Sequence, residues 1–321
     1  MKNSSIYYSV GALLYSPADK KNMAQYIISE KFGSGYSLAL CLEDTINDNF
    51  VKEAETQLVS TINNIYKELQ TNTAFYLPKI FIRVRNPAQL TLIDKKLGDS
   101  NEIITGYIIP KFCIENADIY IEQIQKLNCI HKHTKYFMPI YENDSVVNLK
   151  HRYDNLYTLK DKLDLTEKYV LNIRVGGNDL SNIFGFRREY DESIHQISPI
   201  SNIFSDIVTI YGTDYIISGP VFEYYSGTNW ESGLRKEIQD DKLCGFTGKT
   251  VIHPNQIPIV NDEYKISRKN YNDALQILNW DTKNDSFVSG NITKERMNEY
   301  KTHFNWAQKI LYLAENYGIK D

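Results

Sequence analysis

Cysteines are few in this sequence, and none of them has the spacing of a disulfide framework or a zinc site. Cys41, Cys113, Cys129 and Cys244 are scattered over 321 residues without a CxxC pair, which argues against both kinds of structure. A strong charge bias is also missing. The formal net charge is only -4, so no bulk electrostatic signal favours nucleic acid or an anionic membrane as a partner. The simplest expectation is a protein of the reducing cytoplasm that binds neither.

Long apolar runs are missing too, although hydrophobic residues make up 42% of the chain. None of the runs approaches the ~20 residues that are needed to cross a bilayer. The apolar N-terminal segment carries Lys2 as its basic region and runs directly into Pro17 and Asp19, unlike a cleaved signal peptide. We therefore expect no membrane insertion.

Short apolar runs rich in β-branched and aromatic residues are present instead, and polar segments with helical spacing separate most of them. One such segment, 50–70, has an apolar residue at every third or fourth position. Nearly continuous apolar runs are typical of parallel strands buried on both faces, and eight of them alternating with helices predict a (β/α)8 TIM barrel. An open doubly wound sheet is the rival architecture. The runs are 9–16, 36–42, 79–85, 102–110, 135–141, 168–175, 214–220 and 248–253.

The pattern changes after residue 258. Two helical segments follow, 268–280 and 293–318, joined by the polar linker 281–291. A (β/α)8 barrel is complete without these two segments. We therefore predict a TIM-barrel catalytic domain over 1–258 and a C-terminal helical extension over 259–321. The apolar residues of the extension must be covered either by the barrel or by a neighbouring subunit.

Polar residues follow most of the predicted strands. The βα loops form the open mouth of a barrel, and catalytic groups gather there because the interior is packed. Solvated loop charges would explain any one of these residues, but they explain the whole set less well. The set comprises Glu43 and Asp44, Arg83 and Arg85, Lys111, Glu142, Asp179 in "GGND", Glu223, and His253.

The two arginines lie in the run "KIFIRVR". Strand alternation places Phe81, Arg83 and Arg85 on one face and three aliphatic residues on the other, so both arginines should point into the barrel or its mouth. A buried guanidinium needs a carboxylate from the protein or from a substrate. A structural ion pair with Glu43 or Glu142 fits Arg83, which lies deeper. Arg85 is better placed to hold a substrate carboxylate by two hydrogen bonds.

Glu142 and Asp179 follow two separate strand runs, with no histidine or cysteine at ligand spacing nearby. Such oxygen ligands fit Mg²⁺, which typically takes one or two carboxylates and fills its other positions with water and substrate oxygens. Gly176 and Gly177 would let the backbone approach a ligand, and a helix starting near Asp179 would direct N–H groups at an anion. An ordinary helix N-cap at Asn178 or Asp179 explains the same residues without any ligand.

Seven motifs occur in the order seen in the citrate lyase β-subunit and HpcH/HpaI aldolase superfamily, and this resemblance extends over about residues 10 to 260. "LEDT" together with "GKTVIHPNQI" is more specific than either motif alone. "GGNDLSNIFGFRR" and "SGPVFEYY" resemble most closely the branch of carbon–carbon bond lyases associated with tellurite-resistance gene clusters. The motifs are "LYSPADK" (14–20), "LCLEDT" (40–45), "IRVRNP" (82–87), "IIPKF" (108–112), "MPIYEN" (138–143), "VGGNDLSNIFG" (175–185) and "GFTGKTVIHPNQI" (245–257).

The resemblance implies a TIM barrel that binds Mg²⁺ through Glu142 and Asp179, with an arginine of the "RVR" strand holding the carboxylate of a 2-oxo acid. It also implies cleavage or formation of a carbon–carbon bond, often on a CoA or carrier-protein thioester. Homo-oligomers are usual, commonly trimers or multiples of three, with C-terminal helices that cap a neighbouring mouth.

The sequence departs from the family pattern at three places. Cys41 replaces the first acidic residue of the usual "DLED". "RVRNP" is one residue longer than the usual "RVNP", which leaves open whether Arg83 or Arg85 holds the carboxylate. Asn143 follows Glu142 where a threonine is common. These changes argue against the usual acyl-CoA substrate more than they argue against the metal site.

The leading hypothesis is a Mg²⁺-dependent lyase of the retro-aldol or Claisen type, acting on a small 2-oxo or 2-hydroxy acid, either free or as a CoA or carrier thioester. Lys111 is interpreted as balancing the acidic cluster rather than forming a Schiff base. The alternative is a non-catalytic TIM barrel that serves a stress-response cluster as a ligand-binding or assembly component. The predicted catalytic residues are Arg83, Arg85, Glu43, Asp44 and Lys111, and the predicted substrate contacts are Gly176, Gly177, Glu223 and His253.

Overall fold

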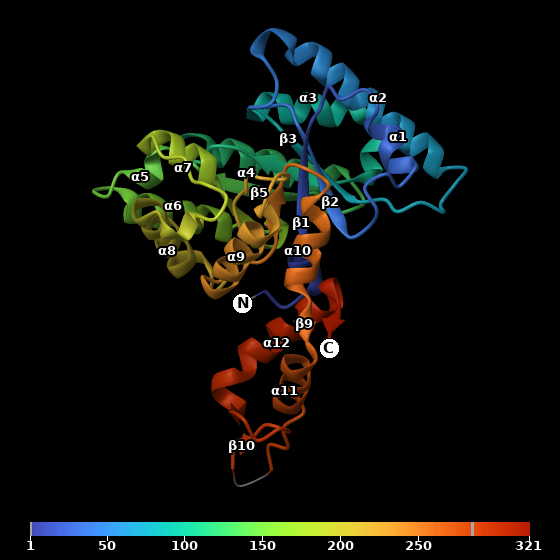
Figure 1. Cartoon of the computed structure of the whole chain (residues 1–321). Coiled ribbons are helices and arrows are strands. Elements are labelled where there is room, and N and C mark those ends of the chain that lie inside the picture. The colour runs from blue at the N-terminus through green and yellow to red at the C-terminus, as the bar shows by residue number, and fades with distance from the viewer. Residues whose placement is uncertain (1, 284–285) are drawn as a thin grey trace.

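The computed structural model of the chain describes residues 2–283 and 286–321. Eight parallel strands form the centre of the molecule, one for each of the predicted runs (Figure 1). Most strands are shorter than the apolar run that predicted them, because the runs continue into the flanking loops. The strands are β1 (Ala12–Pro17), β2 (Tyr36–Cys41), β3 (Lys79–Arg83), β4 (Ile104–Ile109), β5 (Tyr136–Tyr141), β6 (Ile173–Val175), β7 (Ile217–Ser218) and β8 (Lys249–Val251).

The strands pair in the order β7-β6-β5-β4-β3-β2-β1-β8. A further parallel bridge joins Gly219, next to β7, to Lys249 of β8. Beside it, the Thr247 N–H donates to the Ile217 carbonyl over 2.7 Å. These contacts bring the two ends of the sheet together, so the TIM-barrel prediction is confirmed and the open sheet is excluded.

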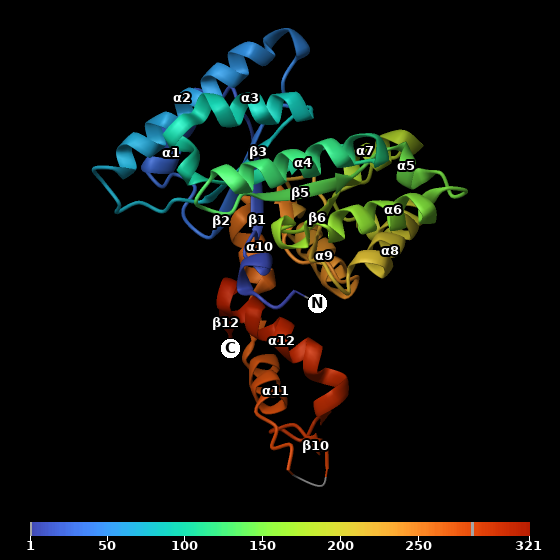
Figure 2. The ribbon, with the colours of Figure 1, turned by 180° about the vertical axis from the view of Figure 1, so that it is seen from behind.

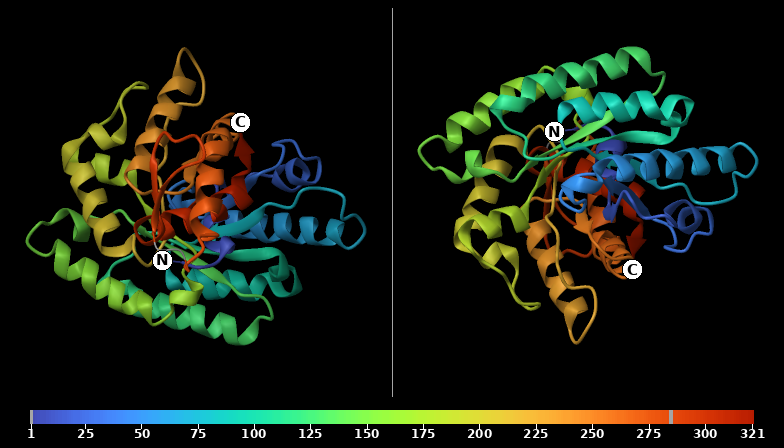
Figure 3. Two further views of the ribbon diagram at one scale, coloured as in Figure 1. Left: turned by 90° about the horizontal axis from the view of Figure 1, so that it is seen from below. Right: turned by 90° about the horizontal axis from the view of Figure 1, so that it is seen from above.

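Helices surround the strands, as the views along the barrel show (Figure 3). The predicted helix 50–70 is present as α2, and its bounds differ from the prediction by one residue at each end. The helices around the barrel are α1 (Met23–Ile28), α2 (Val51–Leu69), α3 (Pro87–Leu97), α4 (Ile114–Ile130), α5 (Asp144–Val147), α6 (Arg152–Asp164), α7 (Gly177–Phe184), α8 (Ser198–Tyr211), α9 (Trp230–Leu243) and α10 (Gln256–Tyr264). Short 3-10 turns are η1 (Ser5–Tyr8), η2 (Asp48–Phe50), η3 (Gly98–Ile103), η4 (Glu167–Tyr169) and η5 (Ile194–Gln196).

Strand alternation divides the buried apolar residues into two layers. Ile80 and Ile82 of β3 belong to the cluster that also contains Leu58 and Ile62 of α2. Phe81, between them, belongs to a separate cluster made largely of residues from the other strands. The first layer therefore fills the space between strands and helices, and the second fills the barrel interior.

The C-terminal extension projects from the end of the barrel where the strands begin, beside the N-terminus (Figures 1 and 2). Its apolar residues pack against Tyr8 of η1 and Ile216 just before β7, and the Tyr317 hydroxyl donates to the Tyr8 carbonyl over 3.2 Å. The extension contains β9 (Ile266–Ser267), α11 (Arg268–Leu278), β10 (Val288–Gly290), β11 (Met297–Glu299), α12 (Tyr300–Tyr317) and β12 (Ile319–Lys320).

The predicted helix 293–318 is wrong at its start. Residues 293–299 form a turn and β11, and α12 begins only at Tyr300. The Asn291 side chain accepts from the Glu295 and Arg296 N–H groups, so the local turn competes successfully with the helix. Residues 284 and 285 of the predicted linker lie outside the described residues.

The predicted division at residue 258 falls inside α10. Ile257, Ile259 and Val260 of this helix belong to the apolar cluster of the barrel, so a boundary after Tyr264 fits the packing better. Among the described residues, no helix combines the length and apolar character that a membrane crossing requires.

Candidate functional site

A cavity of about 420 Å³ opens where the barrel strands end, on the side opposite the C-terminal extension. Residues from seven of the eight strands, or from the loops that follow them, reach its wall, as expected for a site at the carboxyl ends of barrel strands. Its charged and polar lining includes Tyr15, Asp44, Arg83, Glu142, Arg174, Asp179 and Thr250.

Arg83, the last residue of β3, is the centre of the acidic cluster. Its Nη2 lies 2.8 Å from a Glu43 carboxylate oxygen, 2.9 Å from Asp44 and 3.1 Å from Glu142. Burial opposes the charge of Arg83, but the carboxylates, Glu142 foremost, raise its pKa above the ordinary value. The arginine therefore stays charged, as a cation shared by three acids. Its Nε has no hydrogen-bond partner in the described part of the chain.

Lys111 supports the same acids from the end of β4. Its ammonium lies 2.7 Å from Glu43 and 3.2 Å from Asp44, and its backbone N–H donates to Glu142 over 2.9 Å. Partial burial opposes the charge, yet the hydrogen bond to Glu43 and the nearby carboxylates raise the pKa of Lys111 above its usual value. A lysine held protonated in this way is a poor Schiff-base nucleophile, which agrees with its predicted balancing role.

Glu142 and Asp179 lie close enough to repel each other. Burial raises the pKa of Glu142 to about 8; Arg83 works against this rise, and the charge of Asp179 adds to it. A divalent cation between the two carboxylates would relieve both effects. In the described residues no group of three or more His, Cys, Asp and Glu side chains has metal-site spacing, so the chain offers two carboxylates, the number that Mg²⁺ typically takes.

Gly176 makes room for this arrangement. A Cβ atom at this position would overlap Glu142 Cβ and lie 2.5 Å from Glu142 Oε2. At Gly177, a Cβ would lie 2.5 Å from Ile194 Cδ1 and 2.9 Å from Pro220 Cβ. Both glycines line the cavity, and their predicted contact with a ligand stays a prediction. Gly176 thus leaves room for the Glu142 side chain at the cavity, where Glu142 and Asp179 would be the two carboxylates to hold a Mg²⁺ ion.

Helix α7 begins differently from the prediction. Its N-cap is Gly176 rather than Asn178 or Asp179, and Asp179 lies in the first turn. The Asp179 side chain is thus free of a capping role and lines the cavity. The interpretation of Asp179 as a helix N-cap is therefore wrong.

Arg85 lies outside the cavity, because β3 ends at Arg83 and strand alternation ends with it. Its Nε donates to the Leu42 carbonyl over 2.6 Å, its Nη2 to the Glu43 and Ile46 carbonyls, and its Nη1 pairs with Asp48. The guanidinium therefore organises the loop after β2. Of the two arginines, only Arg83 is placed to meet a substrate in this cavity.

Glu223 and His253 also lie away from the cavity wall. Glu223 faces the exposed Arg187, 3.4 Å away. The His253 ring stacks on Tyr225 with 4.6 Å between centroids. Their assignment as substrate contacts stays a prediction without a contact in the cavity to support it.

Arg174 is a charged cavity residue that the sequence analysis did not select. It is the central residue of β6, 2% exposed, with a guanidinium that donates to Thr250 on β8. The signal was present in the sequence, since Arg174 is a charge inside the apolar run "KYVLNIRV".

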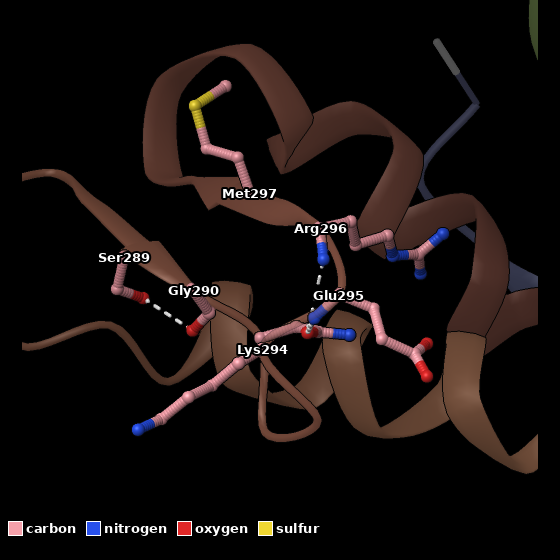
Figure 4. Close-up of a pocket in the computed structure, with 7 residues that line it drawn as sticks. Ser289, Gly290, Lys294, Glu295, Arg296 and Met297 are labelled. Carbon is pink, nitrogen blue, oxygen red and sulfur yellow. Dashed lines mark hydrogen bonds between the residues drawn. The ribbon is translucent and has the colours of Figure 1, made fainter.

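A second hollow lies far from the barrel mouth, in the turn between β10 and β11 (Figure 4). Its Ser289 hydroxyl donates to the Gly290 carbonyl, and the charged ends of Lys294, Glu295 and Arg296 point in different directions. Ligand sites need polar groups that converge, so this turn is not a candidate site.

Solved structures share the fold of this chain. A CitE protein of Mycobacterium tuberculosis, solved with magnesium, acetoacetate and coenzyme A, is 16% identical with a TM-score of 0.62, over 96% of this chain and 99% of that one. The citrate lyase β subunit from the same organism, with oxaloacetate and magnesium, is 17% identical with a TM-score of 0.52, over 81% and 99%. RipC of Yersinia pestis is 15% identical with a TM-score of 0.52, over 80% and 95%.

These identities show the fold alone, and no curated protein sequence matches the chain. The family comparison is more specific. The family of carbon–carbon bond lyases of the TIM-barrel fold matches residues 4–319, nearly the full length. The predicted barrel and the predicted carbon–carbon lyase class are both confirmed at the level of the family. The chain belongs to the carbon–carbon bond lyase family of the TIM-barrel fold.

Proposed function

We propose that this chain is a Mg²⁺-dependent lyase that cleaves or forms a carbon–carbon bond next to the oxo or hydroxy group of a small acid. The observation that carries the proposal is the pair Glu142 and Asp179 beside Arg83 in a cavity at the carboxyl ends of the barrel strands. Magnesium, acetoacetate and oxaloacetate in the related structures support the same ligand classes.

Glu142 and Asp179 would hold the metal ion. When bound, Mg²⁺ supplies Lewis acidity that stabilises negative charge on the oxygens next to the breaking bond. Glu43 and Asp44 keep Arg83 over the cavity, and Lys111 in turn holds these two acids in place. Arg83 lines the cavity, where its guanidinium would face the substrate's own carboxylate. Such a fixed guanidinium neutralises the carboxylate without reorganising during the reaction.

The chain's residues also limit the substrate. The cavity is about 420 Å³, which suits a small acid whose thioester part, if it has one, extends out of the mouth. Ile140, Val175, Val221 and Ile252 provide apolar wall around the charged groups. An apolar wall lowers the local dielectric and so strengthens the electrostatic interactions beside it.

Isothermal titration of 2-oxo acids with and without Mg²⁺ tests the proposal directly. We expect wild-type protein to bind an oxo acid only in the presence of Mg²⁺, and Glu142→Gln to lose this binding. The matched control is Glu53→Gln, because Glu53 lies on the exposed side of α2. Binding that ignores Mg²⁺, or that survives in Glu142→Gln, would refute the proposed site.

The non-catalytic alternative predicts the same binding without turnover. A barrel that retains the ligand site but only senses or assembles would bind Mg²⁺ and oxo acid and release them unchanged. Following the bound acid by NMR for the appearance of a cleaved product separates the two functions. The product expected for a lyase contains one of the two carbon fragments of the bound acid.

A further inference from the structure

A cavity larger than the one at the barrel mouth lies where the barrel meets the C-terminal extension, and we call it the extension cavity. Its volume is about 560 Å³. The barrel contributes parts of α9 and α10 to its wall, and the extension contributes parts of β9, α11, α12 and β12. This junction is at the end of the barrel away from the mouth (Figure 1). The two cavities share no lining residue in the described chain.

Four lysines line the extension cavity, and no aspartate or glutamate of the described chain does. The lysines are Lys242 of α9, Lys265 between α10 and β9, Lys309 of α12 and Lys320 of β12. Each is at least partly exposed, so a ligand can reach it. Because the four come from separate elements, only the folded chain brings these charges together. Positive charge concentrated in one hollow attracts anions.

Carboxylates of the protein neutralise these charges only in part. Lys265 lies 3.5 Å from Asp262, an acid that also pairs with an arginine. The ammonium groups of Lys242 and Lys320 donate to backbone carbonyls over 2.7 and 3.4 Å, and a carbonyl bears no full charge. At Lys309, burial lowers the pKa, and no acid of the described chain opposes this effect. An anion in the cavity would supply the missing counter-charge.

The N-terminus of helix α11 opens on the same cavity. Ser267 is its N-cap and Asn270 lies in its first turn, and both line the wall. The positive end of the helix dipole therefore adds to the charge of the lysines. Ammonium groups bind phosphate as compact point charges, and helix N-termini bind it through their free N–H groups. The two features together favour a phosphate group.

Apolar side chains form most of the remaining wall. Phe246, Tyr264 and Trp306 are aromatic, and aliphatic residues of α9, β9 and α12 accompany them. A free phosphate ion would leave this surface unused. Pockets with apolar walls and a few charged groups take organic molecules, and aromatic walls suit flat rings. The wall therefore favours a ligand with a ring system attached to its phosphate.

We propose that the extension cavity binds a small organic phosphate whose uncharged part is an aromatic ring system. The phosphate lies by Lys242 and Lys309 near the N-terminus of α11, and the ring packs on the aromatic wall. Since the wall comes from both parts of the chain, the bound ligand joins the extension to the barrel. This site is separate from the barrel mouth and does not depend on the proposed lyase activity.

Calorimetric titration of the full chain with AMP and with 1-naphthyl phosphate tests both parts of the ligand. Adenosine and 1-naphthol lack the phosphate, and inorganic phosphate lacks the ring. We expect at least one aromatic phosphate to bind about tenfold or more tightly than its phosphate-free parent and than inorganic phosphate, the gain that a charged hydrogen bond provides. Binding of AMP alone would indicate a nucleotide, and binding of both would indicate aromatic phosphates in general.

Substitutions on the two sides of the cavity locate the binding. Lys309→Met in the extension and Lys242→Met in the barrel should each weaken the aromatic phosphate by about tenfold or more. Lys301→Met is the matched control, because Lys301 is exposed on the same helix as Lys309 and lies outside the cavity wall. It should leave the affinity unchanged, and so should Glu142→Gln at the mouth.

Three results would overturn the inference: neither aromatic phosphate binds, inorganic phosphate binds as tightly as they do, or binding survives in Lys309→Met and Lys242→Met. All three leave the proposed function intact, since Mg²⁺-dependent binding of an oxo acid tests the mouth by itself. Urea unfolding checks for a structural role. Lys309→Met removes a cation that has no acidic partner in the described chain, so its midpoint should equal or exceed that of the wild type. A lower midpoint in both lysine variants than in Lys301→Met would assign these lysines to folding and also overturn the inference.

Discussion

Gly176→Ala is the sharpest perturbation of the proposed metal site, because the added methyl group meets Glu142 and little else. The new Cβ would overlap Glu142 Cβ and lie 2.5 Å from Oε2, against a carbon contact distance of about 3.5–4.0 Å. The backbone at Gly176 has φ -93°, which alanine adopts without strain. Glu142 must therefore move by an amount on the order of 1 Å, which far exceeds the ~0.2 Å tolerance of a metal ligand.

We expect Gly176→Ala to lose about 1–3 kcal/mol of unfolding free energy through overpacking, and to lose Mg²⁺ affinity by about tenfold or more. Urea unfolding measures the first quantity, and calorimetric titration of Mg²⁺ measures the second. The loss of affinity is the critical result, since many substitutions lower stability.

Gly185→Ala is the matched control in the same motif. Gly185 ends α7 with φ +69°, and a Cβ there meets nothing within 4 Å. Alanine in this left-handed conformation costs about 1–2 kcal/mol, a stability loss similar to that of Gly176→Ala, but Glu142 stays in place. Unchanged Mg²⁺ affinity in Gly176→Ala, or equal loss in both variants, would refute the argument that Gly176 exists to position Glu142.

Three further predictions concern buried charges. Arg83→Met removes the cation paired with buried Glu142 and leaves Glu43 and Asp44 with Lys111, so it should lower the unfolding free energy by about 3–5 kcal/mol. Arg187→Met, at 84% exposure, should change it by less than about 0.5 kcal/mol, and equal effects of the two variants would contradict the network. Arg85→Met frees three loop carbonyls, so amide hydrogen exchange in residues 42–48 should accelerate, and unchanged exchange would count against its anchoring role. Burial lowers the pKa of Lys135 from 10.5 to about 8. At a pH between these two values the unfolded chain binds more protons at Lys135 than the folded chain does. Lys135 therefore makes the stability of the wild type rise with pH in this range. Lys135→Met should lack that rise in urea unfolding between pH 8 and 10, and an identical pH slope would disprove it.

The barrel was predictable because its strands are buried on both faces. Such strands need nearly continuous apolar sequence, and runs such as 79–85 and 135–141 differ from the polar helical segments between them. The amphipathic segment 50–70 was equally clear, since burial of one helix face imposes a period of 3.6 residues. The start of α12 was not predictable in this way, because the capping of a turn by Asn291 depends on one side chain and leaves no periodic signal.

The site was predictable in its composition but not in its geometry. Glu142 and Asp179 were selected because parallel strands bring their carboxyl ends together, and both line the cavity, whereas Glu223 and His253, selected on the same ground, do not. Arg85 was misplaced, because alternation holds only while the chain remains a strand, and β3 ends two residues earlier.

The sequence by itself determined the alternation of strands and helices, the family, and part of the charged set at one end of the barrel: Asp44, Arg83, Glu142 and Asp179. Only the tertiary structure decided which charges meet. Three carboxylates lie beside Arg83, whereas in the described part of the chain none lies within salt-bridge distance of Arg174. The physical reason is that hydrophobic periodicity is a local property that every segment carries in its own sequence, whereas ion pairing depends on a few ångströms between residues far apart in the chain.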